Sequence, residues 1–217
     1  MSASQSTGAA TPVEAAREAD SIGPLAPAER ERAVAALAQA FYDDPVFGWF
    51  LRDDTRRLAQ LESLFGLWGR RIWFPQGLSY STASAAGAAL WMAPDTWHVS
   101  MREQLPLLPR MLRDAGLRGF GRIMRMLDRM ESGHPSQSHY YLPIVGVAPA
   151  WQGKGLGTAL LAPVLARCDS EGMPAYLEAS SPRSRACYER NGFRATGELS
   201  VSDSPPVWPM WREPRAG

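Results

Sequence analysis

The fold is decided by a Gly-rich stretch, Val145-Gly146-Val147-Ala148-Pro149-Ala150-Trp151-Gln152-Gly153-Lys154-Gly155-Leu156-Gly157-Thr158. The apolar run 140–147 predicts a buried strand before it, and a helix is expected from about 155 to 170. Glycines let the backbone approach a ligand closely, and the free N–H groups at a helix start attract phosphate. Lys154, the only lysine among 23 basic residues, can add a positive charge there. The stretch therefore predicts a pyrophosphate-binding loop.

Spacing excludes two other phosphate-binding motifs. A Walker A loop needs a glycine five residues before the Gly-Lys pair, but position 148 is alanine, and Gly155 stands where Ser or Thr is required. A Rossmann fingerprint reads G-x-G-x-x-G near the front of a βαβ unit, whereas this loop reads G-x-G-x-G late in the chain. The loop does match the [QR]-x-x-G-x-[GA] signature of GNAT acetyltransferases through Gln152, Gly155 and Gly157.

A second segment, 174–193, resembles the other end of the GNAT core, because Tyr188, Gly192 and Phe193 meet its Tyr-x-x-x-Gly-Phe pattern. Within the family the longer run resembles the puromycin N-acetyltransferase type. The residues that carry this resemblance are 145–147, 152–157, 174–178, 181–183, 188–193 and 205–210, with a weaker echo at 40–45. The resemblance covers about residues 138–212, and the first 130 residues resemble the family mainly in the order of their predicted helices and strands.

The resemblance implies an α/β GNAT fold: a mixed, mostly antiparallel sheet with a central splayed parallel strand pair, flanked by helices. Residues 21–217 would form the domain, with acceptor-side helices and first strands in 21–135 and the acetyl-CoA-binding core and C-terminal strands in 136–217. Residues 1–20 look like a flexible tail. The expected acetyl-CoA-binding residues are Val145, Gly146, Val147, Gln152, Gly153, Lys154, Gly155, Leu156, Gly157, Thr158 and Ser184. Many such enzymes have asparagine at the position of Ser184, and serine has a shorter reach.

The implied reaction is direct acetyl transfer to an amine, without an acyl-enzyme. Tyr188 is the expected general acid for the CoA thiolate, because a phenol is neutral at pH 7 and carries one O–H. The general base is left open between Glu178, on the face that Tyr176 and Ser180 would share, and His139. Cys187 has no histidine nearby in sequence, so it is expected to be a small apolar residue rather than a nucleophile.

The remaining pattern predicts helices and short strands around this core. Helices are expected at about 27–44, ended by Pro45, at 54–74, at 101–131 with a break near Gly116–Gly119, and at 182–190. Strands are expected at 78–82, 88–92, 175–179, 193–199 and 207–211.

Composition limits the class of function. A net charge of +1 argues against a protein built to bind nucleic acid, and no apolar run is long enough to span a membrane. Two cysteines without metal-ligand spacing predict neither a disulfide framework nor a metal site. A cytoplasmic protein, monomeric or homodimeric, is expected.

The acceptor is expected to be a small-molecule primary amine, with antibiotic modification one physiological role. Five of the eight tryptophans lie in the first half, which favours an aromatic or bulky amine, and Asp43 or Asp44 could attract its ammonium group or could be helix-end residues. Two alternatives stay open: a non-catalytic GNAT-like module that senses acetyl-CoA, and a protein N-acetyltransferase with an open peptide groove.

Overall fold

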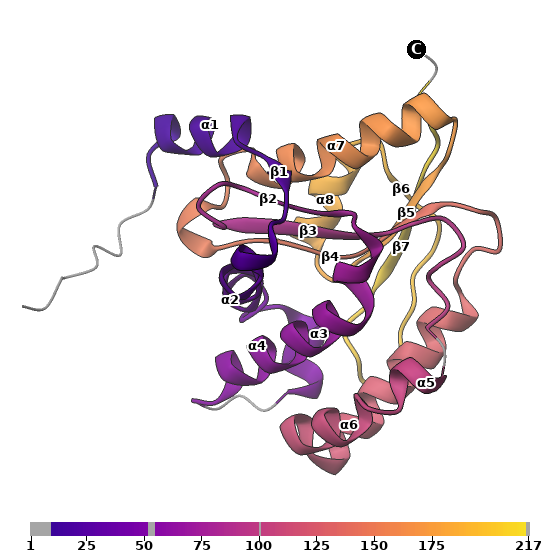
Figure 1. Ribbon diagram of the computed structural model, residues 1–217. Coiled ribbons are helices and arrows are strands. Elements are labelled where there is room, and N and C mark those ends of the chain that lie inside the picture. The colour runs from indigo at the N-terminus through magenta and orange to yellow at the C-terminus, as the bar shows by residue number, and fades with distance from the viewer. Residues whose placement is uncertain (1–9, 52–54, 100, 216–217) are drawn as a thin grey trace, which may run out of the picture.

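A seven-stranded mixed sheet forms the centre of the computed structural model, which describes residues 10–51, 55–99 and 101–215. The strand order is β1-β2-β3-β4-β5-β7-β6, and only the β4–β5 pair is parallel (Figure 1). The strands are β1 (Gly23–Pro24), β2 (Ser79–Ser81), β3 (Gly87–Met92), β4 (Tyr140–Val147), β5 (Ala175–Ala179), β6 (Arg194–Ala195) and β7 (Trp208–Arg212). The predicted fold class is confirmed.

Helices cover both faces of this sheet, with α7 packed on one face and α2 on the other, where α4 lies against α2 (Figure 1). The α-helices are α1 (Pro12–Asp20), α2 (Arg30–Ala40), α3 (Pro45–Phe50), α4 (Arg57–Trp68), α5 (Met101–Gln104), α6 (Leu108–Ser132), α7 (Leu156–Glu171) and α8 (Pro182–Arg190). Shorter helical turns are η1 (Pro27–Glu29), the π-helical η2 (Gly69–Trp73), η3 (Phe74–Gln76) and η4 (Pro149–Trp151). None of the described helices is long and apolar enough to cross a membrane.

The two faces of the sheet bury separate apolar clusters. One packs β5 and the α7 face of β4 against α7, with Leu142, Leu160 and Leu177 among its members. The other packs the opposite face against α2, α4 and α6, with Leu37, Leu61 and Ile144 among its members. Because side chains alternate along a strand, β4 contributes to both clusters, through Leu142 on one face and Ile144 on the other.

The parallel pair separates after only three residue pairs. β4 and β5 are in register from Tyr140↔Ala175 to Leu142↔Leu177 and then diverge. At the same place the pairing of β3 with β4 changes register, because Leu90 pairs with Ile144 while Met92 pairs with Tyr141. The extra β4 residue falls beside Pro143, which has no N–H to donate to a ladder. The predicted splay is therefore present.

The N-terminal segment differs from the prediction of a tail. Residues 12–20 form α1, which packs against α7, and only residues 1–9 of the predicted tail lie outside the described residues. Thr11 and Glu14 form a reciprocal capping box, with Pro12 in the first turn. This Thr-Pro-x-Glu pattern is the local signal that predicts the helix.

Pro45 also has a different role from the predicted one. α2 ends at Ala40, and Pro45 begins α3, where Asp44 caps the free N–H groups of Val46 and Phe47. Pro is well suited to the first turn of a helix because its missing N–H is not needed there. The predicted break near Gly116 is confirmed, since Gly116 has a non-helical backbone (φ 70°) inside α6. The strand predicted at 193–199 is shortened to β6.

Candidate functional site

The Gly-rich loop forms the turn from β4 into α7. Gly153 and Gly155 have φ values of 76° and 85°, which L-residues with a side chain rarely adopt, and α7 begins at Leu156 directly after Gly155. The first N–H groups of α7 have no partner within the helix and point to its N-terminal end. The loop therefore presents backbone donors and the positive end of a helix dipole at one place.

This loop borders a groove of about 680 Å³. The groove lies where β4 and β5 have separated, between the start of α7, the start of α8 and the end of α2. All the predicted acetyl-CoA-binding residues line it except Lys154. The lining includes Val145, Gly146, Val147, Gln152, Gly153, Gly155, Leu156, Gly157, Thr158, Ser184, Cys187 and Tyr188.

The edge of β4 facing the groove has free backbone donors. The Ala148 N–H donates to Ala86 on the β3 side, so alternation along the strand turns the N–H groups of Val145 and Val147 toward the opened gap. The Val147 carbonyl, on the same side, accepts a hydrogen bond from the Gln152 amide at 2.8 Å. Gln152 thus ties the loop to the end of β4.

Two predicted residues are placed differently from the expectation. The Lys154 ammonium donates to the carbonyls of Ala150 and Gln152, at 3.1 and 3.4 Å, within its own loop. The Ser184 hydroxyl exchanges hydrogen bonds with Ser181 in a reciprocal cap at the start of α8. Ser184 still lines the groove, but its hydroxyl is already used to fix α8.

Tyr188 lies where the groove meets a second cavity. This cavity, of about 180 Å³, shares four lining residues with the groove: Phe41, Val145, Ser180 and Tyr188. Burial, with smaller contributions from Cys187 and Asp44, raises the pKa of the Tyr188 phenol well above its usual value. Its hydroxyl is therefore protonated throughout the physiological pH range.

The second cavity is lined mostly by apolar side chains. Residues of α3, α4 and α6 form its walls, and Glu178 is its one carboxylate among the described lining residues. A further chamber of about 140 Å³ adjoins it, and both are lined by Trp68, Trp73, Met111, Leu127, Met130, Tyr141, Pro143 and Glu178. We call these two chambers the acceptor cavity. The groove, Tyr188, the acceptor cavity and Glu178 therefore form one continuous site.

Glu178 carries the main titratable group of the acceptor cavity. Its side chain is 4% exposed, and its Oε1 atom has no hydrogen-bond partner among the described residues. Burial raises the pKa of Glu178 to about 7, although the nearby hydroxyls of Tyr141 and Tyr176 act in the opposite direction. A carboxyl with a pKa near 7 can accept and release a proton at physiological pH.

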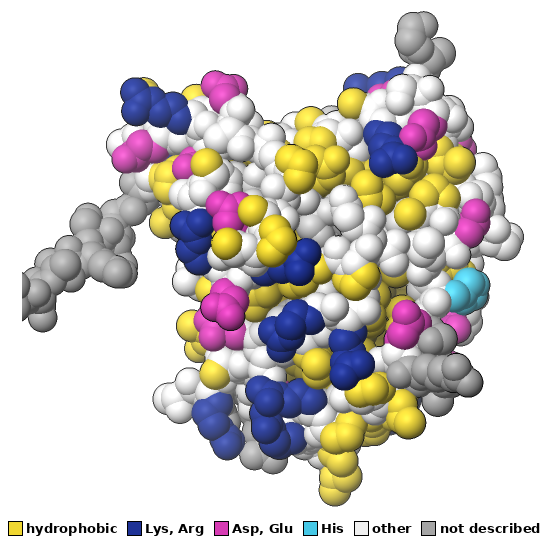
Figure 2. Space-filling view, in the orientation of Figure 1, with side chains coloured by type: hydrophobic (Ala, Val, Ile, Leu, Met, Phe, Trp, Pro, Cys, Tyr) yellow, Lys and Arg dark blue, Asp and Glu magenta, His cyan; other side chains and the backbone are white. Residues whose placement is uncertain are grey.

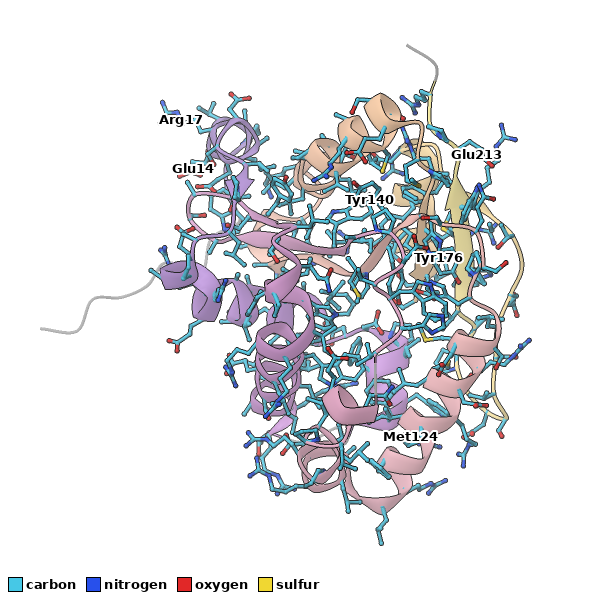
Figure 3. All side chains as sticks on the ribbon, turned by 45° about the vertical axis from the view of Figure 1, so that its right-hand side comes forward. Glu14, Arg17, Met124, Tyr140, Tyr176 and Glu213 are labelled. Carbon is cyan, nitrogen blue, oxygen red and sulfur yellow. The ribbon has the colours of Figure 1, made fainter. Side chains whose placement is uncertain are left out.

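His139 does not line the acceptor cavity. It is 1% exposed, its Nδ1 lies 2.6 Å from the Gln137 carbonyl, and its Nε2 lies 3.0 Å from Nε2 of His134. His134, which the sequence gave no reason to single out, lies between His139 and Glu178, with its Nδ1 3.9 Å from Glu178 Oε1. Figure 3 shows Tyr176 near the C-terminal end of α6, where these rings gather, while Tyr140 points to α7 and donates to Glu171.

Asp44 borders the groove rather than the acceptor cavity. Its carboxylate caps α3 and accepts a hydrogen bond from the Ser180 hydroxyl, so the helix-end interpretation is confirmed. Burial is the largest influence on its pKa, which is raised. No group of three or more His, Cys, Asp or Glu side chains that could hold a metal occurs among the residues described.

A family model described as the acetyltransferase (GNAT) family matches residues 85–193. An uncharacterized N-acetyltransferase of Schizosaccharomyces pombe is 32% identical over 174 residues, which span 75% of this chain and 70% of that protein. The chain belongs to the GNAT family of acetyltransferases.

Solved structures agree with this assignment. A Corynebacterium glutamicum protein described as "histone acetyltransferase HPA2 and related acetyltransferase" is 27% identical, with a TM-score of 0.68, over 91% of this chain and 97% of that one. Arylalkylamine N-acetyltransferase 2 of Aedes aegypti has a TM-score of 0.62 over 89% and 98% of the two chains, at 14% identity, which shows a shared fold alone.

GNAT enzymes use acetyl-CoA as the acetyl donor, and the groove of this acetyltransferase fits that molecule. The loop and the start of α7 offer donors for a pyrophosphate, and the separated edge of β4 offers N–H groups for a pantetheine amide and an acetyl carbonyl. The groove reaches the acceptor cavity at Tyr188, where the thioester would lie.

Proposed function

We propose that this acetyltransferase transfers the acetyl group of acetyl-CoA directly to a small-molecule primary amine. The observation that carries the proposal is the meeting of the groove and the apolar acceptor cavity at Tyr188, with Glu178 in the cavity wall. A donor and an acceptor held at this junction react without diffusing together, an advantage of about 7–11 kcal/mol in well-oriented models.

Each residue at the junction has a chemical task. Glu178 takes a proton from the substrate ammonium, because only the neutral amine has a free electron pair. The N–H groups of Val145 and Val147 stabilise the negative charge that develops on the acetyl oxygen. Tyr188 donates its hydroxyl proton toward the departing thiolate sulfur. The C–N bond forms as the C–S bond breaks, and one proton is released overall when the amine enters as an ammonium ion.

The walls of the acceptor cavity favour a small acceptor with an apolar body. Met111, Ile123, Met126, Leu127 and Met130 of α6 line the cavity, and methionine adapts to ligands of different shape. The buried Trp68 indole N–H, without a partner among the described residues, could donate to a polar group of the acceptor. The combined chambers are of the size that small-ligand sites usually have.

Acetylation of lysines or N-termini is the second candidate, and the description of the Corynebacterium glutamicum relative supports testing it. A small apolar cavity suits a free small amine better than a peptide, which needs a long groove for its backbone. A sensor that binds acetyl-CoA without turnover would need neither Tyr188 at the junction nor Glu178 in the wall of the acceptor cavity.

The experiment is a measurement of free thiol released from acetyl-CoA with a panel of acceptors. The panel contains arylalkylamines, puromycin, a polyamine and a lysine-containing peptide. Turnover of small apolar amines above the peptide supports the proposal, and puromycin tests the antibiotic-modifying role suggested by the sequence. Turnover of the peptide alone would replace it with protein acetylation, and acetyl-CoA binding without turnover would favour the sensor.

We also expect the protein to act in the cytoplasm as a monomer or homodimer. Both cysteines are free thiols, which suits a reducing compartment.

A further inference from the structure

The three histidines of the chain belong to one aromatic cluster, in which His134 lies next to Glu178. Trp97 lies between the rings of His98 and His134, with centroid separations of 3.5 and 3.6 Å. His134 in turn contacts the His139 ring, and both rings pack edge-on against Tyr176. The segments 97–98 and 134–139 therefore form one cluster at the end of the acceptor cavity, which His98 and His134 line.

The hydrogen bonds of this cluster define which nitrogen atoms carry protons. The Gln137 carbonyl can only accept, so the His139 Nδ1 beside it, at 2.6 Å, must carry a hydrogen. A neutral His139 then has a bare Nε2, which requires the His134 Nε2, 3.0 Å away, to be the donor. A neutral His134 is left with a bare Nδ1, and this lone pair faces Glu178 Oε1 at 3.9 Å. One backbone carbonyl thus sets the state of both rings.

We propose that His134, held by His139 and the Gln137 carbonyl, is a positioning residue that receives the O–H of Glu178 when Glu178 has taken the proton of the substrate amine. The inference rests on the proposed function and extends it. The proton moves from the substrate nitrogen to the Glu178 carboxylate, and the resulting carboxylic acid points its O–H at His134 Nδ1. A small rotation of the Glu178 side chain would shorten the 3.9 Å between Oε1 and His134 Nδ1 to hydrogen-bond distance. The proton passes to water after the product leaves.

Burial and charge support a neutral His134 in this task. Burial, with smaller contributions from His139 and His98, lowers the pKa of His134 to about 3, so its lone pair is available at neutral pH. The groups that face the Glu178 carboxyl are Tyr141 from β4, Tyr176 from β5 and His134 from the segment after α6. Glu131 at the end of α6 lines the same chamber. The tyrosine hydroxyls donate to the carboxylate when Glu178 is ionised, and when Glu178 is protonated the bare His134 Nδ1 that faces Oε1 can accept its O–H.

The tautomers can be observed directly, without an acceptor amine. Three histidines give a simple NMR spectrum when the rings are labelled with ¹⁵N. We expect His139 as the Nδ1–H form and His134 as the Nε2–H form at pH 7. The Nδ1–H form of His134 would place a donor opposite Glu178 and would overturn the proposal.

Two variants separate the proposed task from a structural one. His134→Gln keeps a polar group near the Nε2 position, toward His139, but lacks the Nδ1 acceptor, whereas His134→Asn keeps an acceptor near the Nδ1 position. With the best amine of the panel, we expect His134→Gln to lower kcat about 10-fold, with KM for acetyl-CoA unchanged, and to shift the rising limb of the pH profile to lower pH. His134→Asn should recover most of kcat and the wild-type limb. Equal losses in both variants with an unshifted limb would overturn the proposal.

A double-mutant cycle completes the test. If His134 acts through Glu178, adding His134→Gln to Glu178→Gln should change kcat less than twofold, because the partner is already lost. A multiplicative loss would mean a separate, structural effect of His134. If no amine is acetylated by the wild type, the proposed function fails, while the tautomers still decide the arrangement of the histidines.

Discussion

Glu178 and His134 face each other at the end of the acceptor cavity, with Oε1 and Nδ1 3.9 Å apart and both side chains less than 5% exposed. Burial lowers the pKa of the His134 imidazole to about 3, so His134 is neutral at pH 7. Burial raises the pKa of the Glu178 carboxyl to about 7, so Glu178 exchanges between its neutral and charged forms there. A buried carboxyl that is half protonated near neutral pH is suited to moving a proton. Burying it also destabilises the folded state, which points to a functional rather than a structural role.

Replacing Glu178 by Gln should slow the reaction. The amide keeps the size of the side chain but cannot take the proton, so kcat should fall about 10²–10⁴-fold, with KM for acetyl-CoA within twofold. The rising limb of the pH–rate profile, expected near pH 7 in the wild type, should disappear. A variant that keeps wild-type kcat and the same limb would show that another group is the base.

The same substitution should change how stability depends on pH. The folded state binds a proton at Glu178 with a pKa of about 7, against about 4.5 when unfolded, so stability falls as pH rises through this window. Glu178→Gln cannot ionise and should be more stable than the wild type at pH 8 by at most about 3 kcal/mol, with no such gain near pH 4.5. The low pKa of His134 has the opposite effect in both proteins and cancels to a first approximation in the comparison.

Urea unfolding at pH 5 and pH 8 measures this difference. A stability gap of the same size at both pH values would contradict a raised pKa of Glu178.

Gly155→Ala should impair the acetyl-CoA groove. Gly155 has φ 85°, and an L-residue with a side chain pays about 1–2 kcal/mol there. The backbone donors at the start of α7 should shift, raising KM for acetyl-CoA more than KM for the amine. Gly197→Ala is the matched control, because Gly197 is exposed, has no positive φ and would place its new Cβ in open space. Binding of acetyl-CoA by calorimetry gives the comparison, and equal affinities of the two variants would refute the assignment of the loop.

Met130→Trp should block the acceptor cavity. Met130 lines both chambers, so a larger ring there should raise KM for the amine at least about 10-fold and leave KM for acetyl-CoA within twofold. Leu117→Trp adds the same ring on α6 at a position that is 82% exposed, and should have neither effect. Steady-state kinetics with each substrate varied in turn distinguishes the two, and an unchanged KM for the amine in Met130→Trp would place the acceptor elsewhere.

The core of the fold is predictable because its signals are local. The strand β4 lies where the apolar run 140–147 predicts it, and the helix α8 spans the predicted residues 182–190. Gly116 interrupts α6 as expected, since few other residues adopt its backbone. For α1 the two local signals conflict, since the composition of residues 1–20 predicts a tail while the capping box of Thr11 and Glu14 predicts a helix.

The acceptor side is less predictable because it depends on distant contacts. His134 is 44 positions from Glu178, and only the packing of the segment after α6 against β5 brings them together. Pro45 shows a similar limit, since a proline can end one helix or begin the next and only Asp44 as a cap distinguishes the two.

The surface adds a feature that net charge conceals. On the face in Figure 2, Arg side chains gather in the lower half, over the helices drawn below the sheet in Figure 1. Several arginines of α6 form ion pairs, among them Arg110 with Asp114 and Arg122 with Asp203. The net charge of +1 is therefore the sum of surface regions that carry different charges.

The most direct test of the central claim is amine-dependent release of CoA thiol by the wild type and by Tyr188→Phe. We expect release only when a small amine is present. In the variant kcat should fall about 10²-fold or more with acetyl-CoA affinity kept, because the phenylalanine ring fills the same space without a proton to donate. Release that needs no amine, or a variant as fast as the wild type, would contradict acetyl transfer at the junction of the groove and the acceptor cavity with Tyr188 as the acid.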